Sequence, residues 1–171
     1  GQAVLGDTWI SHHGHHKHEA TRGVVNPAHA KHPILTGVQD VFGPTDVYGI
    51  RHLRDDDDVL MLGEVVAGMK TSDPAVQGPK NDPMMPIVWT RMYKGETGNT
   101  SRVVNTTMGA SIDLENEGLR RLLINACLWG LKLESQIKPD LNVEIVGEFK
   151  PSFYGFGSFT KGVKPAAHVL R

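Results

Sequence analysis

The sequence predicts an α/β sandwich followed by an extended tail, because the spacing of its apolar residues changes along the chain. Three segments have the apolar runs or the alternation that are typical of β-strands: Val59–Met69, Ile87–Tyr93 and Arg102–Thr107. A fourth segment, Glu115–Leu131, repeats its apolar residues with the period of about 3.6 that is typical of an α-helix. With 171 residues, the chain has the usual size of a single domain.

The first third of the chain contains few signals of regular structure. A short apolar piece, Ala3–Ile10, leads into a histidine-rich segment. Two X-Pro steps mark Gly23–Leu35 as an extended connection, and Thr36–Tyr48 is rich in turn residues. We interpret the four acids Asp55–Asp58 as a solvated turn, since the alternating carboxylate, carbonyl and glycine positions of a calcium loop are missing.

The predicted strands and helix follow in order. The nearly continuous apolar run of Val59–Met69 favours a strand buried on both faces. Ile87–Tyr93 and Arg102–Thr107 are separated by a Gly/Asn/Thr turn, which predicts a hairpin. Cys127 lies on the apolar stripe of the predicted helix, so we expect its thiol in the core. In the tail, the aromatic and glycine residues of Phe153–Phe159 are expected to hold the chain against the body.

Composition and charge exclude several classes of protein. Hydrophobic residues make up 39% and charged residues 22%, as in a globular protein. The formal net charge of -1 gives no field that would attract nucleic acid or an anionic membrane, and no apolar run reaches the roughly 18 residues of a membrane span. A single cysteine excludes an internal disulfide. No leader is visible after Gly1, so a cytoplasmic and a periplasmic or secreted location both stay open.

The most informative segment is Ser11–Glu19, which contains five histidines beside one glycine. A folded core has no need for so many imidazoles together, because each buried ring must satisfy two nitrogens. Three interpretations stay open: a solvated polar loop, a surface for substrate, and a metal site, with His13, His15 and His16 as candidate zinc ligands. The four-ligand spacing of a zinc finger is absent.

Several motifs in a fixed order resemble the ThuA-like (trehalose-utilisation) family of the class I glutamine-amidotransferase-like superfamily, in the form found in planctomycete-type bacteria. These motifs are the histidine–glycine loop with Thr21-Arg22-Gly23, then His32–Val38, Asn81–Pro86 running into Ile87–Arg91, Arg102–Gly109, Arg120–Trp129 and Phe156–Pro165. The resemblance covers essentially the whole chain.

The resemblance implies a flavodoxin-like, three-layer sandwich with a mostly parallel sheet. Residues 1–135 would be the C-terminal portion of the ThuA-like domain, and residues 136–171 a tail packed on it. Members of the family begin with further strand–helix units, so Gly1 would start well inside the pattern. Because a half-sheet exposes strand edges, we expect another copy or another chain to complete the fold.

The candidate site residues are polar groups near predicted loops and strand ends. The candidate catalytic residues are His13, His16 and Arg22. The two histidines could act as base or ligands, and Arg22 could bind a carboxylate or hydroxyls, unless it forms a structural salt bridge. For substrate binding the candidates are His12, Asn81, Asp82, Met108, Gly109 and Ser111, although Asn81 and Asp82 could equally cap a turn. The histidine loop, Arg22 and the turn Met108–Ser111 are expected around one cleft at the strand ends.

The sequence leads to one activity that we expect and one that we do not expect. The resemblance implies a role in the metabolism of trehalose or a related sugar, by acid–base or metal-assisted chemistry. An amidotransferase needs a cysteine at a strand-to-helix turn, and Cys127 lies in the predicted helix, so we expect no such activity. The alternative is a non-catalytic domain, on the same scaffold, that binds carbohydrate or another protein.

Overall fold

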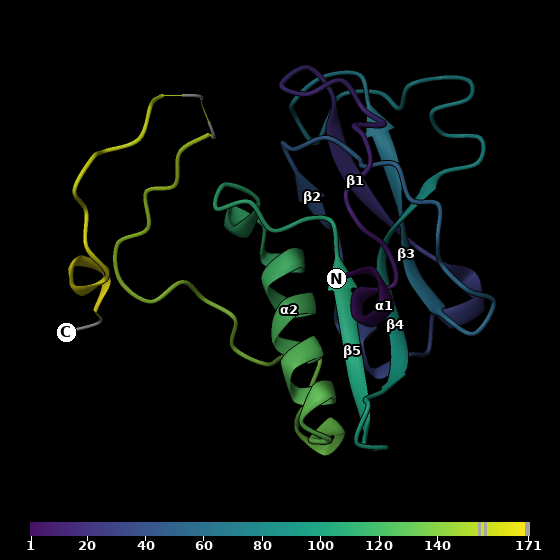
Figure 1. The fold of residues 1–171 in the computed structure, drawn as a ribbon. Helices are drawn as coiled ribbons and strands as arrows, with labels where there is room; N and C mark the ends of the chain where they lie inside the picture. Colours follow the sequence, from purple (N-terminus) through teal and green to yellow (C-terminus); the bar gives the residue numbers. More distant parts are fainter. Residues whose placement is uncertain (154, 156, 170–171) are drawn as a thin grey trace.

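A computed structural model describes residues 1–153, 155 and 157–169 of the chain. Its centre is a five-stranded sheet that curls into a half-barrel, with the strand order β2-β1-β3-β4-β5 (Figure 1). The strands are β1 (Ala20–Val25), β2 (Phe42–Gly43), β3 (Asp58–Val66), β4 (Met85–Lys94) and β5 (Thr100–Thr106). The described residues contain two α-helices, α1 (Gln2–Leu5) and α2 (Glu117–Gly130).

The expectation of a flavodoxin-like, mostly parallel sheet is wrong. Every pair of neighbouring strands in the sheet is antiparallel. Parallel neighbours need a crossover, which is usually a helix, between one strand and the next. Here α2 follows the last strand and therefore connects no two strands of the sheet, while β4 and β5 are joined by a short turn. The predicted hairpin is correct.

The apolar run in β3 reflects the central position of this strand in a curled antiparallel sheet. Val65 belongs to the main hydrophobic core, whereas its neighbour Val66 packs in a smaller cluster with Ala20 and Phe42. Successive side chains of a strand point to opposite faces, so β3 is covered on both. Burial on two faces had been predicted, but it does not require a parallel sheet.

Helix α2 agrees with the predicted helix to within two residues at its start. Its N-cap is Asn116, whose side-chain oxygen accepts a hydrogen bond from Leu119 N at 2.8 Å. The side chains that face the core recur at helical spacing: Leu119, Leu122, Ala126 and Trp129. The prediction that Cys127 is buried is wrong, because this residue is one position past Ala126 and its side chain is turned out to solvent.

Hydrogen bonds from Trp89 and Arg91 fasten α1 to β4. Trp89 Nε1 donates to Leu5 O at 2.7 Å. Arg91 forms a buried ion pair with Asp57, and the same guanidinium reaches Ala3 O at 3.3 Å. These contacts fix the start of the chain against the sheet and so set the position of the residues that follow, up to the histidine-rich segment.

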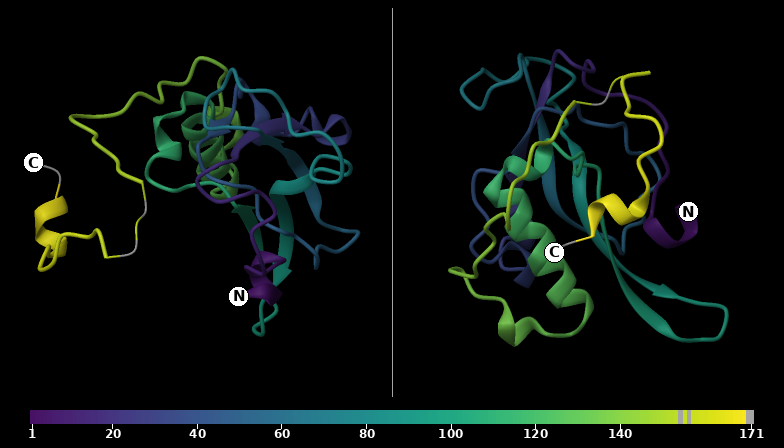
Figure 2. Two further views of the ribbon diagram at one scale, coloured as in Figure 1. Left: turned by 90° about the horizontal axis from the view of Figure 1, so that it is seen from above. Right: turned by 90° about the vertical axis from the view of Figure 1, so that its left-hand side faces the viewer.

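Among the described residues, the beginning of the tail is held on α2 by hydrogen bonds. Arg120 Nε donates to Val143 O at 2.8 Å, and an Arg121 Nη donates to Leu141 O at 2.8 Å. Further along, Ser111 Oγ donates to Ser152 O at 3.4 Å, and the last part of the tail lies apart from the sheet and α2 (Figures 1 and 2). Phe153 and Phe159 are exposed, and Tyr154 and Phe156 lie outside the described residues, so the proposed clamp by aromatic side chains stays a prediction.

The described residues include no helix that is both long and apolar enough to span a lipid bilayer.

Candidate functional site

The histidine-rich segment lies along the residues that follow β2. The backbone N–H groups of His13 and Gly14 both donate to Val47 O, at 2.8 and 2.9 Å. A bridge between His12 and Tyr48 continues this pairing. Gly14 is needed for the close approach, because an added Cβ would meet the Cβ of Asp46 at 3.0 Å. Backbone pairing therefore brings the histidines next to residues about 30 positions later in the chain.

Thr45, the residue before Asp46, is held by hydrogen bonds to two other parts of the fold. Its hydroxyl donates to the carboxylate of Asp113 at 2.8 Å, and its carbonyl accepts a hydrogen bond from the hydroxyl of Thr21 at 2.7 Å. Asp113 also accepts hydrogen bonds from the N–H groups of Gly109 and Ala110, both at 3.1 Å. Burial raises the pKa of Asp113 against the effect of these hydrogen bonds. Thr45 is thus held between β1 and the turn after β5, and this fixes Asp46.

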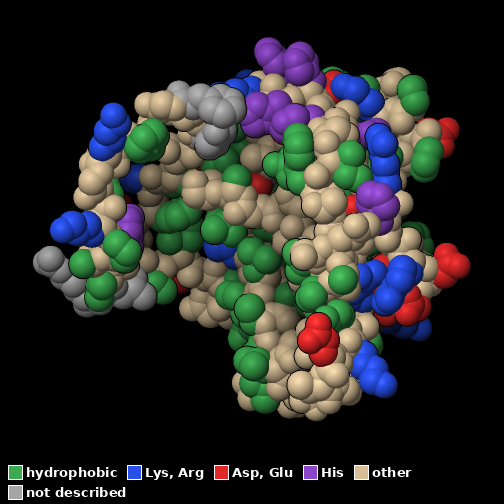
Figure 3. All heavy atoms as spheres, viewed as in Figure 1, with side chains coloured by type: hydrophobic (Ala, Val, Ile, Leu, Met, Phe, Trp, Pro, Cys, Tyr) green, Lys and Arg blue, Asp and Glu red, His purple; other side chains and the backbone are tan. Residues whose placement is uncertain are grey.

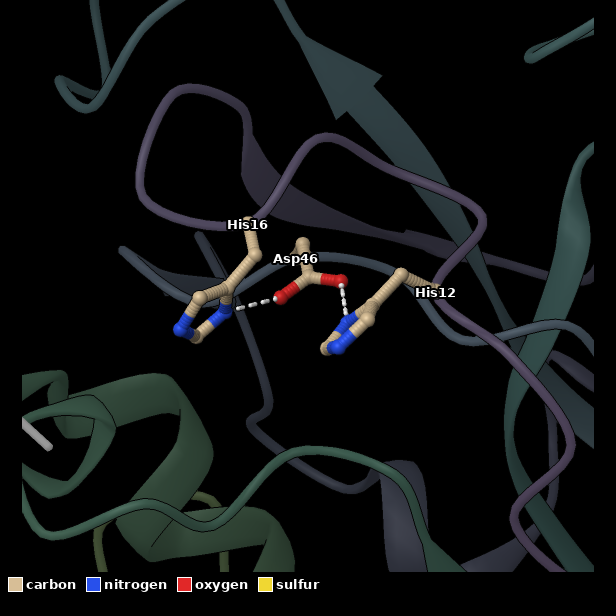
Figure 4. Close-up of side chains that lie close together, drawn as sticks. All are labelled: His12, His16 and Asp46. Carbon is tan, nitrogen blue, oxygen red and sulfur yellow. Dashed lines mark hydrogen bonds and ion pairs between the residues drawn. The ribbon is translucent and has the colours of Figure 1, made fainter. Parts of the chain in front are cut away.

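Asp46 joins two imidazoles into one cluster, which we call the His12–Asp46–His16 cluster (Figure 4). His12 Nδ1 lies 2.6 Å from Asp46 Oδ2, and His16 Nδ1 lies 2.8 Å from Asp46 Oδ1. The Asp46 side chain is 1% exposed, whereas those of His12 and His16 are 44% and 40% exposed. The two ring centroids are 5.1 Å apart. A buried carboxylate therefore holds two rings that solvent reaches.

This cluster could hold a metal ion. Two imidazoles and one carboxylate offer one ligand atom each, and these atoms lie within 4.8 Å of one another. Two histidines with one carboxylate are also the protein ligands of several catalytic zinc sites, which keep a further position open. Without a metal, an imidazole whose Nδ1 is hydrogen-bonded to a carboxylate has its other nitrogen available to accept or donate a proton.

An aromatic cavity adjoins the cluster. It has a volume of about 290 Å³. Its lining contains five large apolar side chains (Leu5, Trp9, Tyr48, Ile50 and Trp89), and polar residues that include Thr8, Asn105 and Thr107. The rings of Trp9 and Tyr48 both meet the His12 ring edge to face, with centroids at 5.6 and 5.7 Å. The space-filling view shows histidine side chains gathered at one end of the molecule (Figure 3).

The remaining histidines of the segment have other contacts. His13 Nε2 lies 2.9 Å from Lys80 O, and the rings of His15 and His18 stack with centroids 4.3 Å apart. Of the three predicted zinc ligands, His16 belongs to the cluster, while His13 and His15 lie outside it.

Arg22, Asn81 and Asp82 are not members of the cluster. Arg22 is paired with Glu64 and also donates to the carbonyls of Thr71 and Asp73, which is the structural salt bridge considered as its alternative role. The side chain of Asn81 is used within the fold, because it accepts from Val65 N and donates to the carbonyls of Val65 and Val76. Asp82 is exposed.

The turn Met108–Ser111 lies close to the cluster through Thr45 and Asp113, as described above. Met108 is buried in the main core, and Gly109 has a φ of 143°, which favours glycine. Ala110 and Ser111 line a separate hollow with residues of the tail, and Arg22 lines another with Phe42 and Thr71. The structure therefore brings the turn near the histidine loop but places Arg22 elsewhere.

Sequence reasoning missed Asp46, Trp9 and Tyr48. Trp9 comes shortly before the histidines. A tryptophan next to a polar segment could have indicated a binding surface, because tryptophan is enriched at interfaces. Asp46 stands alone in a turn-rich segment, and nothing in its immediate neighbours marks it as a partner of histidine. Only the backbone pairing with Val47 brings it there.

Comparison of this chain with protein-family models, with curated proteins and with solved structures gives no match. The site must therefore be interpreted from its own geometry.

Proposed function

We propose that this chain acts in carbohydrate metabolism as a ThuA-like protein, binding a sugar in the aromatic cavity and acting on it through His12 and His16. The observation that carries the proposal is that Trp9 and Tyr48 line the cavity and also contact His12. Ligand pockets are commonly apolar and aromatic with a few polar groups that orient the ligand. Asn105 and Thr107 supply amide and hydroxyl groups suited to sugar hydroxyls. The order of sequence motifs that resembles the ThuA-like family also supports the proposal, although the sheet is antiparallel and not the parallel one that the resemblance implies.

We further propose zinc as the metal of the His12–Asp46–His16 cluster, because imidazole nitrogen is a ligand that suits this ion. When bound, zinc supplies a water molecule of lowered pKa and polarises an oxygen of the substrate. Without zinc, Nε2 of His12 and of His16 would accept or return a proton. With zinc bound, the two rings would hold the ion, and the aromatic side chains would keep water from one face of the ligand.

The proposal includes no amidotransferase activity. A nucleophilic cysteine needs a strand-to-helix turn and an adjacent base. Cys127 lies inside α2, and its exposure does not change that position. The expectation of no amidotransferase activity thus rests on the position of Cys127 within α2 and not on burial of its side chain.

Titration calorimetry with trehalose and with glucose tests the proposal, with and without zinc. We expect Trp9→Ala to weaken binding at least about tenfold, since aromatic residues dominate the energy of such contacts. Met92→Ala is the matched control, because Met92 is a large exposed apolar side chain (54%, against 60% for Trp9) outside the cavity lining. Sugar binding without turnover would favour the non-catalytic alternative. Hydrolysis of glutamine, or no sugar binding at all, would contradict the proposal.

A further inference from the structure

We infer that Asp46 is a positioning residue, which turns His12 and His16 so that their Nε2 atoms bind a divalent cation while both Nδ1–H groups stay on the carboxylate. The inference rests on the metal of the proposed function, but it does not depend on any sugar. It separates two ways in which the same three side chains could take an ion. In one, Asp46 is itself a ligand; in the other, it acts only through the two rings.

The hydrogen bonds favour the second arrangement. An ionised carboxylate only accepts hydrogen bonds, so each Nδ1 that lies next to Asp46 carries the hydrogen. Each ring then has Nε2 as its unprotonated nitrogen, which is the form that binds a metal. Asp46 therefore selects the same tautomer for both rings at once. Carboxylates that fix metal-binding histidines in this way are a common feature of metal sites.

The distances leave no room for an ion between Asp46 and the rings. A zinc ion with bonds of about 2.0–2.1 Å in tetrahedral geometry separates two of its ligand atoms by about 3.3 Å. The two observed separations of nitrogen and oxygen are 2.6 and 2.8 Å. For Asp46 to become a ligand, both hydrogen bonds would have to break and the carboxylate would have to move.

Asp46 is not free to move in this way. Its side chain is buried, and its neighbours Thr45 and Val47 are both held by hydrogen bonds, to Asp113 and to the backbone of the histidine loop. The two rings, in contrast, are more than one third exposed, so an ion can approach them from solvent. Figure 4 shows the carboxylate between the rings, with Nδ1 of each ring toward it and Nε2 on the other edge.

Nuclear magnetic resonance of protein with ¹⁵N-labelled histidine tests the tautomers directly. In the metal-free protein, we expect His12 and His16 to carry hydrogen on Nδ1. Addition of zinc alone should shift the Nε2 resonances of these two rings and leave the Nδ1–H signals in place. Loss of the Nδ1–H signals on addition of zinc would overturn the inference, because Nδ1 would then be the ligand atom. A wild-type chain that binds no zinc would overturn it as well.

The variant Asp46→Asn provides the second test. An amide has a single acceptor oxygen, and its NH₂ group donates, so one ring has to move its hydrogen to Nε2 and is lost as a ligand. We expect zinc affinity to fall about 10- to 100-fold, with one ring in the altered tautomer. Wild-type affinity in Asp46→Asn would contradict the positioning role.

Asp7→Asn is the matched control for this variant. Asp7 is also a buried carboxylate that accepts a hydrogen bond from an imidazole, that of His52 at 2.8 Å, but it lies outside the cluster. Its substitution should leave zinc affinity unchanged. Failure of this inference can be told from failure of the proposed function: zinc bound through Nε2 without sugar binding contradicts only the proposed function, and sugar binding with Nδ1 ligation contradicts only the inference.

Discussion

Asp46 and Asp7 are both buried aspartates that form hydrogen bonds with histidine rings, yet their other hydrogen-bond partners differ. Asp7 accepts from His52 Nδ1 and also from the backbone N–H groups of Thr8, Arg51 and His52. Asp46 has only the two rings of His12 and His16 among the described residues. Hydrogen bonds from the backbone thus stabilise the carboxylate of Asp7, so we regard Asp7 as a structural residue.

The difference shows how the same pair of residue types takes on different roles. The backbone donors around Asp7 satisfy the carboxylate whatever the state of His52. The carboxylate of Asp46 is hydrogen-bonded to two exposed rings, so a cation that binds these rings also changes the surroundings of Asp46. This comparison motivates four predictions.

The largest expected effect is on stability, from Asp7→Ala. Three backbone N–H groups and one ring nitrogen lose their acceptor, and hydrogen bonds to a charged group contribute more than neutral ones. We expect the free energy of unfolding to fall by about 3 kcal/mol, measured by urea denaturation. The control Asp56→Ala removes an exposed carboxylate paired with Arg54 and should cost less than about 0.5 kcal/mol. Equal effects of the two variants would show that Asp7 has no special structural role.

The second prediction concerns zinc affinity in His12→Ala and His16→Ala. Each variant removes a ligand, so we expect a loss above about 100-fold, which is more than outer-shell substitutions cause. His15→Ala is the control, because His15 lies outside the cluster and stacks on His18. Calorimetry after dialysis against a chelator measures the affinity. Equal losses in all three variants would indicate a non-specific histidine-rich surface.

The third prediction is a pH dependence that comes from Asp7. Burial alone would raise its pKa, but hydrogen bonds from His52, Arg51 and Thr8 lower the pKa to about 2, from 3.8. A lowered pKa contributes stability that is complete above about pH 4 and is lost as the pH falls toward 2. The wild type should therefore lose more stability than Asp7→Asn between pH 4 and 2, in thermal unfolding at each pH. Parallel curves would show that Asp7 does not titrate in this range.

The smallest effect is expected for Asp113→Asn. Because burial raises the pKa of Asp113, its charged form gains little from the folded state. An amide oxygen can still accept from Gly109 N and Ala110 N, and the NH₂ group can donate to the Thr45 hydroxyl. We expect a change in the free energy of unfolding below about 1 kcal/mol at pH 7, in urea denaturation. A loss above 2 kcal/mol would show that the charge itself is needed there.

Part of the fold follows from local patterns. The strands β3 and β4 and the helix α2 each carry their apolar pattern within one segment, and β5 follows β4 after a recognisable turn, so all four were predicted. Strand β1 was missed because Thr21, Arg22 and Gly23 interrupt its apolar residues, and it is paired with β2 on one side and β3 on the other. Strand β2 has only two residues, too few for any pattern.

The candidate site, too, could be predicted from the sequence only in part. The histidine loop was recognised from its composition, and His12 and His16 were among its candidates. Neither the choice of these two rings nor Asp46 could be predicted, because 34 and 30 positions separate them from Asp46 in the chain. The pairing of His13 and Gly14 with Val47 makes the contact.

The amino-acid pattern was sufficient for the helix, three strands and the histidine loop, since each depends on the spacing of side chains within one short segment. The folded chain was needed for the antiparallel order of the strands, for the exposure of Cys127 and for the group of His12, His16 and Asp46. These features depend on which distant segments pack together. Such packing is a balance of burial and hydrogen bonding over the whole molecule, so no single segment encodes it.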